Sequence, residues 1–116
     1  MEGRENLGST TYESLFSGKH ELDTTIVTIA AGKSHKRKEI LGVKDGKCEI
    51  LGTSGYTASY ILAEDADASS SDVEAVAYKS GGFIKNELIV DDSYTLTESD
   101  VETLRNAGIY LENAQL

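Results

Sequence analysis

The sequence predicts a mainly β domain with short helices, a small α+β fold that follows a flexible N-terminal arm. Three observations support this fold class. β-branched residues that partly alternate fill residues 21–31, and similar short runs recur later in the chain. Asp45 and Gly46 stand between two apolar runs, as in a two-residue β-hairpin. A strong helix pattern occurs once, near the C-terminal end.

The composition fits one globular domain. The chain has 116 residues, of which 39% are hydrophobic and 27% are charged. Residues 1–20 are polar and show little pattern, and Leu15 and Phe16 are their adjacent apolar pair. We therefore expect a flexible arm over residues 1–20 and a folded domain over residues 21–116. A frayed terminus without a function is the alternative interpretation of the first segment.

The expected strands follow the apolar runs in order. The Asp45-Gly46 turn predicts a hairpin, because both central positions of such a turn need positive φ. Residues 55–63 suit either a strand or a short helical turn, and residues 73–80 alternate as a strand that Gly81 and Gly82 are expected to break. The other predicted elements are a strand within 21–31, hairpin strands near 38–43 and 48–53, a new element from 83 to 90, and a last strand after Gly108.

The predicted helix has a start and a stop signal. Ser99 can cap its first turn, and Glu102, three residues later, completes a capping box. Val101, Leu104 and Ala107 then share one face, and Gly108 provides a left-handed end.

The charge balance argues against nucleic acid as a partner. The net charge is −9, and the excess lies in residues 59–116, which hold three Lys/Arg and twelve Asp/Glu. Such a surface repels nucleic acid. Cys48 is the only cysteine, so no internal disulfide can form. The N-terminus lacks a signal-peptide pattern, and the apolar run 26–31 is too short to span a bilayer, so no membrane is expected either.

The acidic loop after residue 63 invites a metal-site interpretation. Asp65, Asp67 and Ser69 have the alternate spacing of calcium ligands, but Ser70 replaces the required glycine and Val76 replaces the required glutamate. A solvated connector between two strands is the better prediction. No cofactor is expected, because the chain also lacks clusters of thiols and imidazoles suited to zinc.

Nucleophilic catalysis finds little support in the sequence. Cys48 lies in a predicted strand, where a small buried hydrophobic role is expected. His35 belongs to the lysine-rich run 33–38 and is expected to be exposed. We interpret that basic run as a solvent-exposed turn beside the predicted hairpin rather than as a nucleic-acid contact. We therefore expect a protein that is not an enzyme and acts through its surface.

Three segments carry a family resemblance. ILAEDADA (61–68), VEAVAYKSGGF (73–83) and NAGIYLENA (106–114) resemble the tailed-bacteriophage head decoration proteins. The resemblance implies a compact, β-clip-like domain that is synthesised in the host cytoplasm and binds the outer surface of the expanded phage or prophage head. It implies a homotrimer at three-fold positions that cements the major capsid protein against the pressure of packaged DNA.

The resemblance implies two contact surfaces, to which we assign candidate residues from their apolar side chains. The N-terminal arm would add a strand to a sheet edge of the shell protein, with contacts from Tyr12, Leu15, Phe16 and Leu22. The trimer interface would contain Tyr78, Phe83 and Ile84. Two alternatives stay open. One is a surface or carbohydrate-binding module that uses Tyr56, Tyr60 and Tyr78, and the other is a small hydrolase that uses Asp65 and Asp67.

Overall fold

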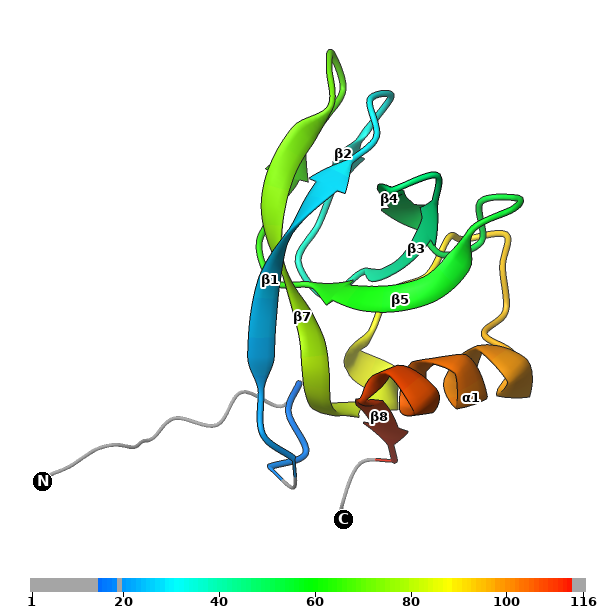
Figure 1. Ribbon diagram of the computed structural model, residues 1–116. Coiled ribbons are helices and arrows are strands. Elements are labelled where there is room, and N and C mark those ends of the chain that lie inside the picture. Colours follow the sequence, from blue (N-terminus) through cyan, green and yellow to red (C-terminus); the bar gives the residue numbers. More distant parts are fainter. Residues whose placement is uncertain (1–14, 19, 114–116) are drawn as a thin grey trace, which may run out of the picture.

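The computed structural model describes residues 15–18 and 20–113, and it is mostly β with one α-helix among them (Figure 1). Tyr12 and the rest of residues 1–14 lie outside the described residues, as do residue 19 and residues 114–116. The mainly β prediction is confirmed. The elements are β1 (Asp23–Ile29), β2 (Ser34–His35), β3 (Ile40–Lys44), β4 (Lys47–Ile50), β5 (Thr57–Leu62), β6 (Ala66–Asp67), β7 (Val73–Ile84), a 3-10 turn η1 (Lys85–Glu87), α1 (Glu98–Ala107) and β8 (Ile109–Glu112).

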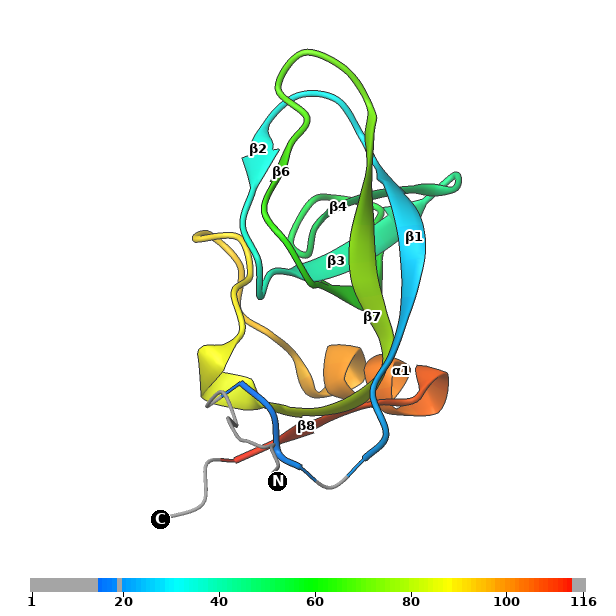
Figure 2. The same ribbon diagram turned by 90° about the vertical axis from the view of Figure 1, so that its left-hand side faces the viewer.

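The main sheet closes on itself. Its strand order is β1-β4-β3-β5-β7-β8, and β1 also pairs antiparallel with β7, so that the first five strands of this order form a small barrel. β8 pairs in parallel with the last four residues of β7, and α1 lies below β5 (Figure 1). β2 and β6 lie side by side as a separate two-stranded sheet. This sheet lies at the end of the molecule opposite β8 (Figure 2).

The core consists of two clusters of aliphatic side chains and a few aromatic ones. The first lies toward α1 and β8 and includes Leu15, Phe83 and Leu104, each with no exposed surface. The second lies toward β1 and β4 and includes Val27, Ile29 and Cys48. Cys48 is 2% exposed, which confirms its predicted buried role, and burial raises the pKa of its thiol to about 11.

Several predicted elements are confirmed by the pairings. β3 and β4 form the expected hairpin, and its turn residues Asp45 and Gly46 have φ of 52° and 80°. Residues 57–62 form a strand rather than a helical turn, and β1 lies within the predicted range 21–31. Along β1, Val27 and Ile29 are buried, as alternation predicts for a strand with one face on the core.

The predicted break at Gly81 and Gly82 is wrong. β7 runs through both glycines to Ile84, because β8 pairs with each residue from Gly81 to Ile84. Gly81 has φ of 140°, which glycine adopts without strain, so the strand passes this point without ending. The predicted separate element from 83 to 90 is therefore the end of β7 followed by η1.

The predicted N-cap of α1 is two residues too late. Thr97 has extended backbone geometry, and its hydroxyl accepts a hydrogen bond from the Asp100 amide at 3.0 Å. The Asp100 carboxylate accepts in return from the Thr97 amide at 3.0 Å, which makes the capping box. Ser99 lies inside the helix, where its carbonyl accepts from the Thr103 hydroxyl. Aspartate at the third helical position replaces the glutamate that the sequence pattern favoured.

Replacing Gly108 tests the helix end. Gly108 caps α1 with φ of 102°, and a Cβ there would meet nothing closer than 3.5 Å, so the cost of Gly108→Ala comes from backbone conformation alone. We expect a loss of about 1 kcal/mol in urea unfolding, and a smaller loss for Gly108→Asn, since asparagine tolerates the left-handed region. A larger loss for asparagine than for alanine would contradict this account.

Candidate functional site

The acidic loop uses its first carboxylates to hold backbone amides. Glu64 accepts a hydrogen bond from the Val76 amide at 2.8 Å, and Asp65 accepts one from the Arg37 amide at 2.8 Å. Each bond ties the loop to another part of the chain. Both carboxylates belong to exposed residues, and no sheltered pair forms of the kind that acid/base chemistry needs.

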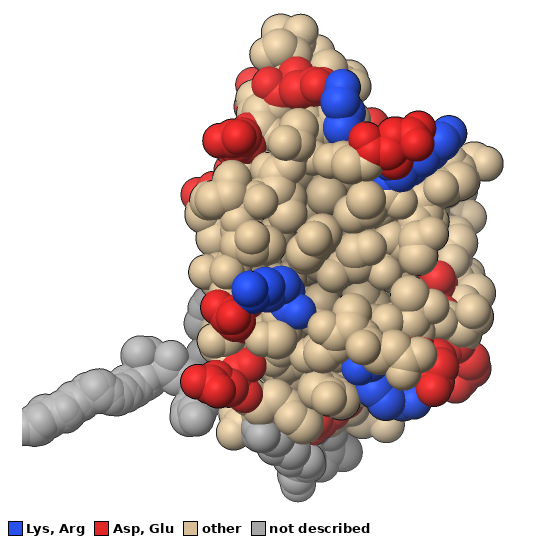
Figure 3. Space-filling model, viewed as in Figure 1, with Lys and Arg blue, Asp and Glu red and all other residues tan. Residues whose placement is uncertain are grey.

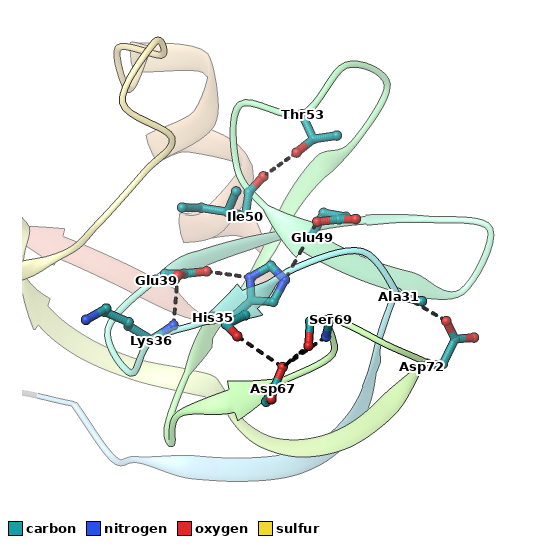
Figure 4. A network of polar contacts seen from close by, with 11 residues as sticks. Ala31, His35, Lys36, Glu39, Glu49, Ile50, Thr53, Asp67, Ser69 and Asp72 are labelled. Carbon is teal, nitrogen blue, oxygen red and sulfur yellow. Dashed lines mark hydrogen bonds and ion pairs between the residues drawn. The ribbon is translucent and has the colours of Figure 1, made fainter.

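The remaining carboxylates of the loop have structural partners as well. The hydroxyl and amide of Ser69, together with the Ser34 hydroxyl, donate to Asp67 and lower the pKa of that carboxyl (Figure 4). The Lys47 ammonium, 2.6 Å from Asp72, lowers the pKa of the Asp72 carboxyl. Within residues 15–18 and 20–113, no group of three His, Cys, Asp or Glu side chains is arranged to hold a metal ion. The loop is a hydrogen-bonded connector between β5 and β7.

The prediction that His35 is exposed is wrong. His35 is 2% exposed, and its Nδ1 lies 2.7 Å from Oε1 of Glu39, which is itself 6% exposed. The other carboxylate oxygen of Glu39 accepts from the Lys36 amide at 2.8 Å. Nε2 of His35 faces Oε1 of Glu49 at 3.7 Å, and neither atom has a hydrogen-bond partner among the described residues (Figure 4). The lysines beside His35 suggested a surface turn, but the turn folds its histidine inward and directs Lys36 to solvent.

The residues predicted for the arm and for the trimer interface lie close together. Phe16 packs edge-on against Tyr78 with ring centroids 5.6 Å apart, and it lies 5.9 Å from the ring of Phe83. Tyr78 and Phe83 are 5.3 Å apart. Leu15 packs in the same cluster and has no exposed surface. Two predicted surfaces therefore meet in one apolar cluster at the end of β7, a neighbourhood that residue spacing along the chain could not reveal.

Leu15 and Phe16 are held by backbone bonds as well as by packing. The Ile84 amide donates to the Leu15 carbonyl at 2.6 Å, and the Ser17 amide donates to the Gly82 carbonyl at 3.1 Å. Phe16 forms an antiparallel bridge with Phe83. These two arm residues therefore pack against the core of the domain. β1, which follows them in the chain, also pairs antiparallel with β7. In this position, Leu15 has no side-chain surface to offer a partner.

The other predicted residues differ in exposure. Leu22 is 42% exposed, so its side chain is accessible, whereas Phe83 is fully buried and Ile84 is 9% exposed. Tyr78 is half-buried. Of the predicted trimer residues, Tyr78 therefore presents the most side-chain surface, and Phe83 supports it from beneath.

Both ends of the described chain meet at Ile84. Its amide bonds Leu15 on one side, and it pairs with Glu112 of β8 on the other. Figure 1 shows these ends at the bottom of the body, away from β2. The face in Figure 3 carries acidic groups near its upper loops, along its left side and at its lower right, with a few basic groups beside them, while much of its middle is uncharged. Leu15, Ile84 and Glu112 therefore lie together at this end of the body.

Two of the three tyrosines proposed for carbohydrate stacking pack against different core clusters. The Lys44 ammonium lies 6.0 Å from the centre of the Tyr56 ring. Tyr60 packs against the cluster of Val27 and Ile29, whereas Tyr78 packs against the cluster of Leu15 and Phe83. This separation removes the main support for a stacking platform.

Comparison with known proteins identifies the family of the chain. No helix in the described part of the chain is long and apolar enough to cross a membrane. A search of curated proteins finds no match to the chain. The family model described as "Bacteriophage lambda head decoration protein D" matches residues 8–109, which is nearly the whole chain. The chain therefore belongs to the bacteriophage lambda head decoration protein D family, and its role is the decoration of a phage capsid.

Proposed function

We propose that the protein binds the outer surface of the expanded phage head as a homotrimer at three-fold positions and stabilises the head against the pressure of packaged DNA. Its partner is the major capsid protein, and the role needs no catalytic step. One observation carries the proposal beyond family membership. Leu15 and Phe16 are fixed to the end of β7 by the hydrogen bond from the Ile84 amide to the Leu15 carbonyl and by the Phe16–Phe83 bridge. Residues 1–14 can then reach a partner from a rigid base.

Strand addition suits this geometry. Leu15 pairs with Ile84, which is the last residue of β7. β7 therefore has no further residues with which a strand before Leu15 could pair. The unpaired donors and acceptors of an extended segment are satisfied when it joins the edge of a partner's sheet. Tyr12 is the aromatic anchor that we propose for this contact, and Leu22, which is 42% exposed, adds apolar surface near the base. Leu15 and Phe16 then act as the root of the arm.

Trimer formation strengthens capsid binding beyond what a single arm provides. Ordering a segment of 14 residues costs conformational entropy, so one arm alone binds weakly. Three arms on one trimer bind with a high effective concentration after the first has engaged. We propose that the trimer contact lies at the end of β7, with Tyr78 as the accessible side chain and with Phe83 and Ile84 holding the backbone in place. The whole assembly then resists displacement although each contact is modest.

Two truncations test the arm. Removal of residues 1–14 should abolish co-sedimentation with expanded, DNA-free heads of the phage or prophage that encodes the chain, because the proposed strand is lost. The same truncation should leave the thermal midpoint of the free domain within about 2 °C, since it removes none of the described core contacts. Removal of residues 1–20 should also destabilise the domain, because Leu15 and Phe16 leave the core.

The intact chain is the positive control for both truncations. It should bind the heads saturably and raise the temperature at which they disrupt. A chain without residues 1–14 that decorates heads as well as the intact protein would refute the proposed arm.

A further inference from the structure

Two adjacent glycines of β7 leave room for the segment that follows the arm root. A Cβ on Gly82 would lie 2.2 Å from Oγ of Ser17 and 2.8 Å from Cδ2 of His20. A Cβ on Gly81 would lie 2.4 Å from Cδ2 of Leu22. Real Cβ atoms do not approach other atoms so closely, so the side chains of Ser17, His20 and Leu22 pack directly on the glycine backbone. Gly82 does not have positive φ, so this close approach is the reason for a glycine there.

His20 connects this segment to the C-terminal strand. Its ring stacks on Tyr110 with centroids 4.1 Å apart and an interplanar angle of 19°. Its Nε2 lies 3.2 Å from Oε2 of Glu112. Tyr110 is the parallel neighbour of Gly82 across the β7–β8 pairing, and Glu112 is the neighbour of Ile84. The imidazole thus lies over Gly82 and reaches two side chains of β8.

We propose that His20 is a positioning residue: stacked on Tyr110 and seated on Gly82, it holds the arm root against β7 and so fixes the point from which the arm leaves the body. The inference rests on the proposed function for its effect on capsid binding, but the contact itself exists in the free protein. The root makes two backbone bonds to β7, and a loop that is pinned at His20 loses less entropy when those bonds close. A fixed root presents the arm in one register to the shell.

Amide hydrogen exchange of the free, full-length protein reads the contact directly. The Ser17 and Ile84 amides donate across the root pairing, and the Leu62 amide, which donates to the Glu39 carbonyl in the barrel, is the internal reference. In His20→Ala, we expect the first two amides to exchange about two- to tenfold faster while Leu62 is unchanged, because an aromatic pair contributes a modest local stabilisation.

Companion variants separate the two contacts of His20. His20→Phe keeps the stack on Tyr110 and should retain most of the protection, while His20→Gln keeps a polar atom near Glu112 and should lose most of it. Gly82→Ala should accelerate exchange at least as much as His20→Ala, because its backbone accepts alanine and the new Cβ displaces both the Ser17 hydroxyl and the imidazole. The double variant His20→Ala/Tyr110→Leu should exchange no faster than either single variant, as expected for two groups of one contact.

Capsid binding gives the functional readout. His20→Ala and Gly82→Ala should bind expanded heads about two- to tenfold more weakly than the intact chain, and His20→Phe should bind nearly as well. If the intact chain binds heads while His20→Ala binds equally well and shows unchanged exchange, the positioning role is refuted. If the intact chain fails to bind, the proposed function fails instead, and the exchange rates alone decide whether His20 holds the root.

Discussion

Leu15→Ala should destabilise the free domain by about 2–5 kcal/mol, although Leu15 lies in the part of the chain that the sequence assigned to a flexible arm. The side chain has no exposed surface and packs with Phe83 and Leu104 in the cluster next to α1 and β8. Truncation to alanine removes buried apolar area and leaves a cavity that the surrounding strands and helix fill incompletely. Urea denaturation monitored by circular dichroism measures the change in the free energy of unfolding.

Leu22→Ala is the matched control for this loss. Leu22 is a leucine of the same N-terminal region, but it is 42% exposed, and its truncation should cost less than about 1 kcal/mol. Equal and small effects of the two substitutions would show that residues before β1 do not pack on the body in solution. Leu15 would then belong to the flexible arm, and the proposed anchoring of the arm to β7 would be wrong.

His35→Ala should cost about 1–3 kcal/mol of stability, because it leaves a buried carboxylate oxygen of Glu39 without its side-chain hydrogen-bond partner. Glu39 keeps its bond from the Lys36 amide, but its other oxygen loses the imidazole 2.7 Å away while the carboxylate stays 6% exposed. Glu49 also loses the group that faces it at 3.7 Å. The buried oxygen of Glu39 then has no side-chain group in place of the imidazole. Thermal and urea unfolding of the same variant should agree on the loss.

Two variants give the His35 prediction its controls. His20→Ala removes a half-exposed histidine at the other end of the body and should leave global stability nearly unchanged. The double variant His35→Leu/Glu39→Leu should recover part of the loss, because no buried carboxylate remains at position 39. If His35→Ala proves as stable as His20→Ala, the buried pair contributes nothing and the interpretation of this network is wrong.

The elements that local signals specify were predictable from the sequence. Asp45-Gly46 fixed the β3–β4 hairpin, since few residues adopt positive φ at two adjacent positions. Gly108 marked the end of α1 for the same reason. The start of α1 was misplaced because Thr97 and Ser99 are both good capping residues, and the choice depends on the backbone geometry at Thr97.

The misplaced features depend on contacts between distant parts of the chain. Gly81 and Gly82 suggested a strand break, but the side chains of Ser17, His20 and Leu22 pack on them, and Gly81 also has positive φ. His35 was predicted to be exposed because lysines surround it in the sequence. The carboxylate that faces its second nitrogen comes from β4, which local sequence does not indicate. Leu15 read as an arm residue because a single apolar pair in a polar stretch gives no period to analyse. Family resemblance supplied the function, which no pattern of reactive side chains indicated.

Electron cryo-microscopy of expanded heads incubated with the full-length chain tests the central claim most directly. The account predicts trimers at the three-fold positions, with the end that carries Leu15, Ile84 and Glu112 facing the shell and with a strand from residues 1–14 added to the major capsid protein. Leu15 should remain packed beside Phe83 in the bound state. Heads that stay bare, or bodies attached by the opposite end that carries β2 and β6, would contradict it.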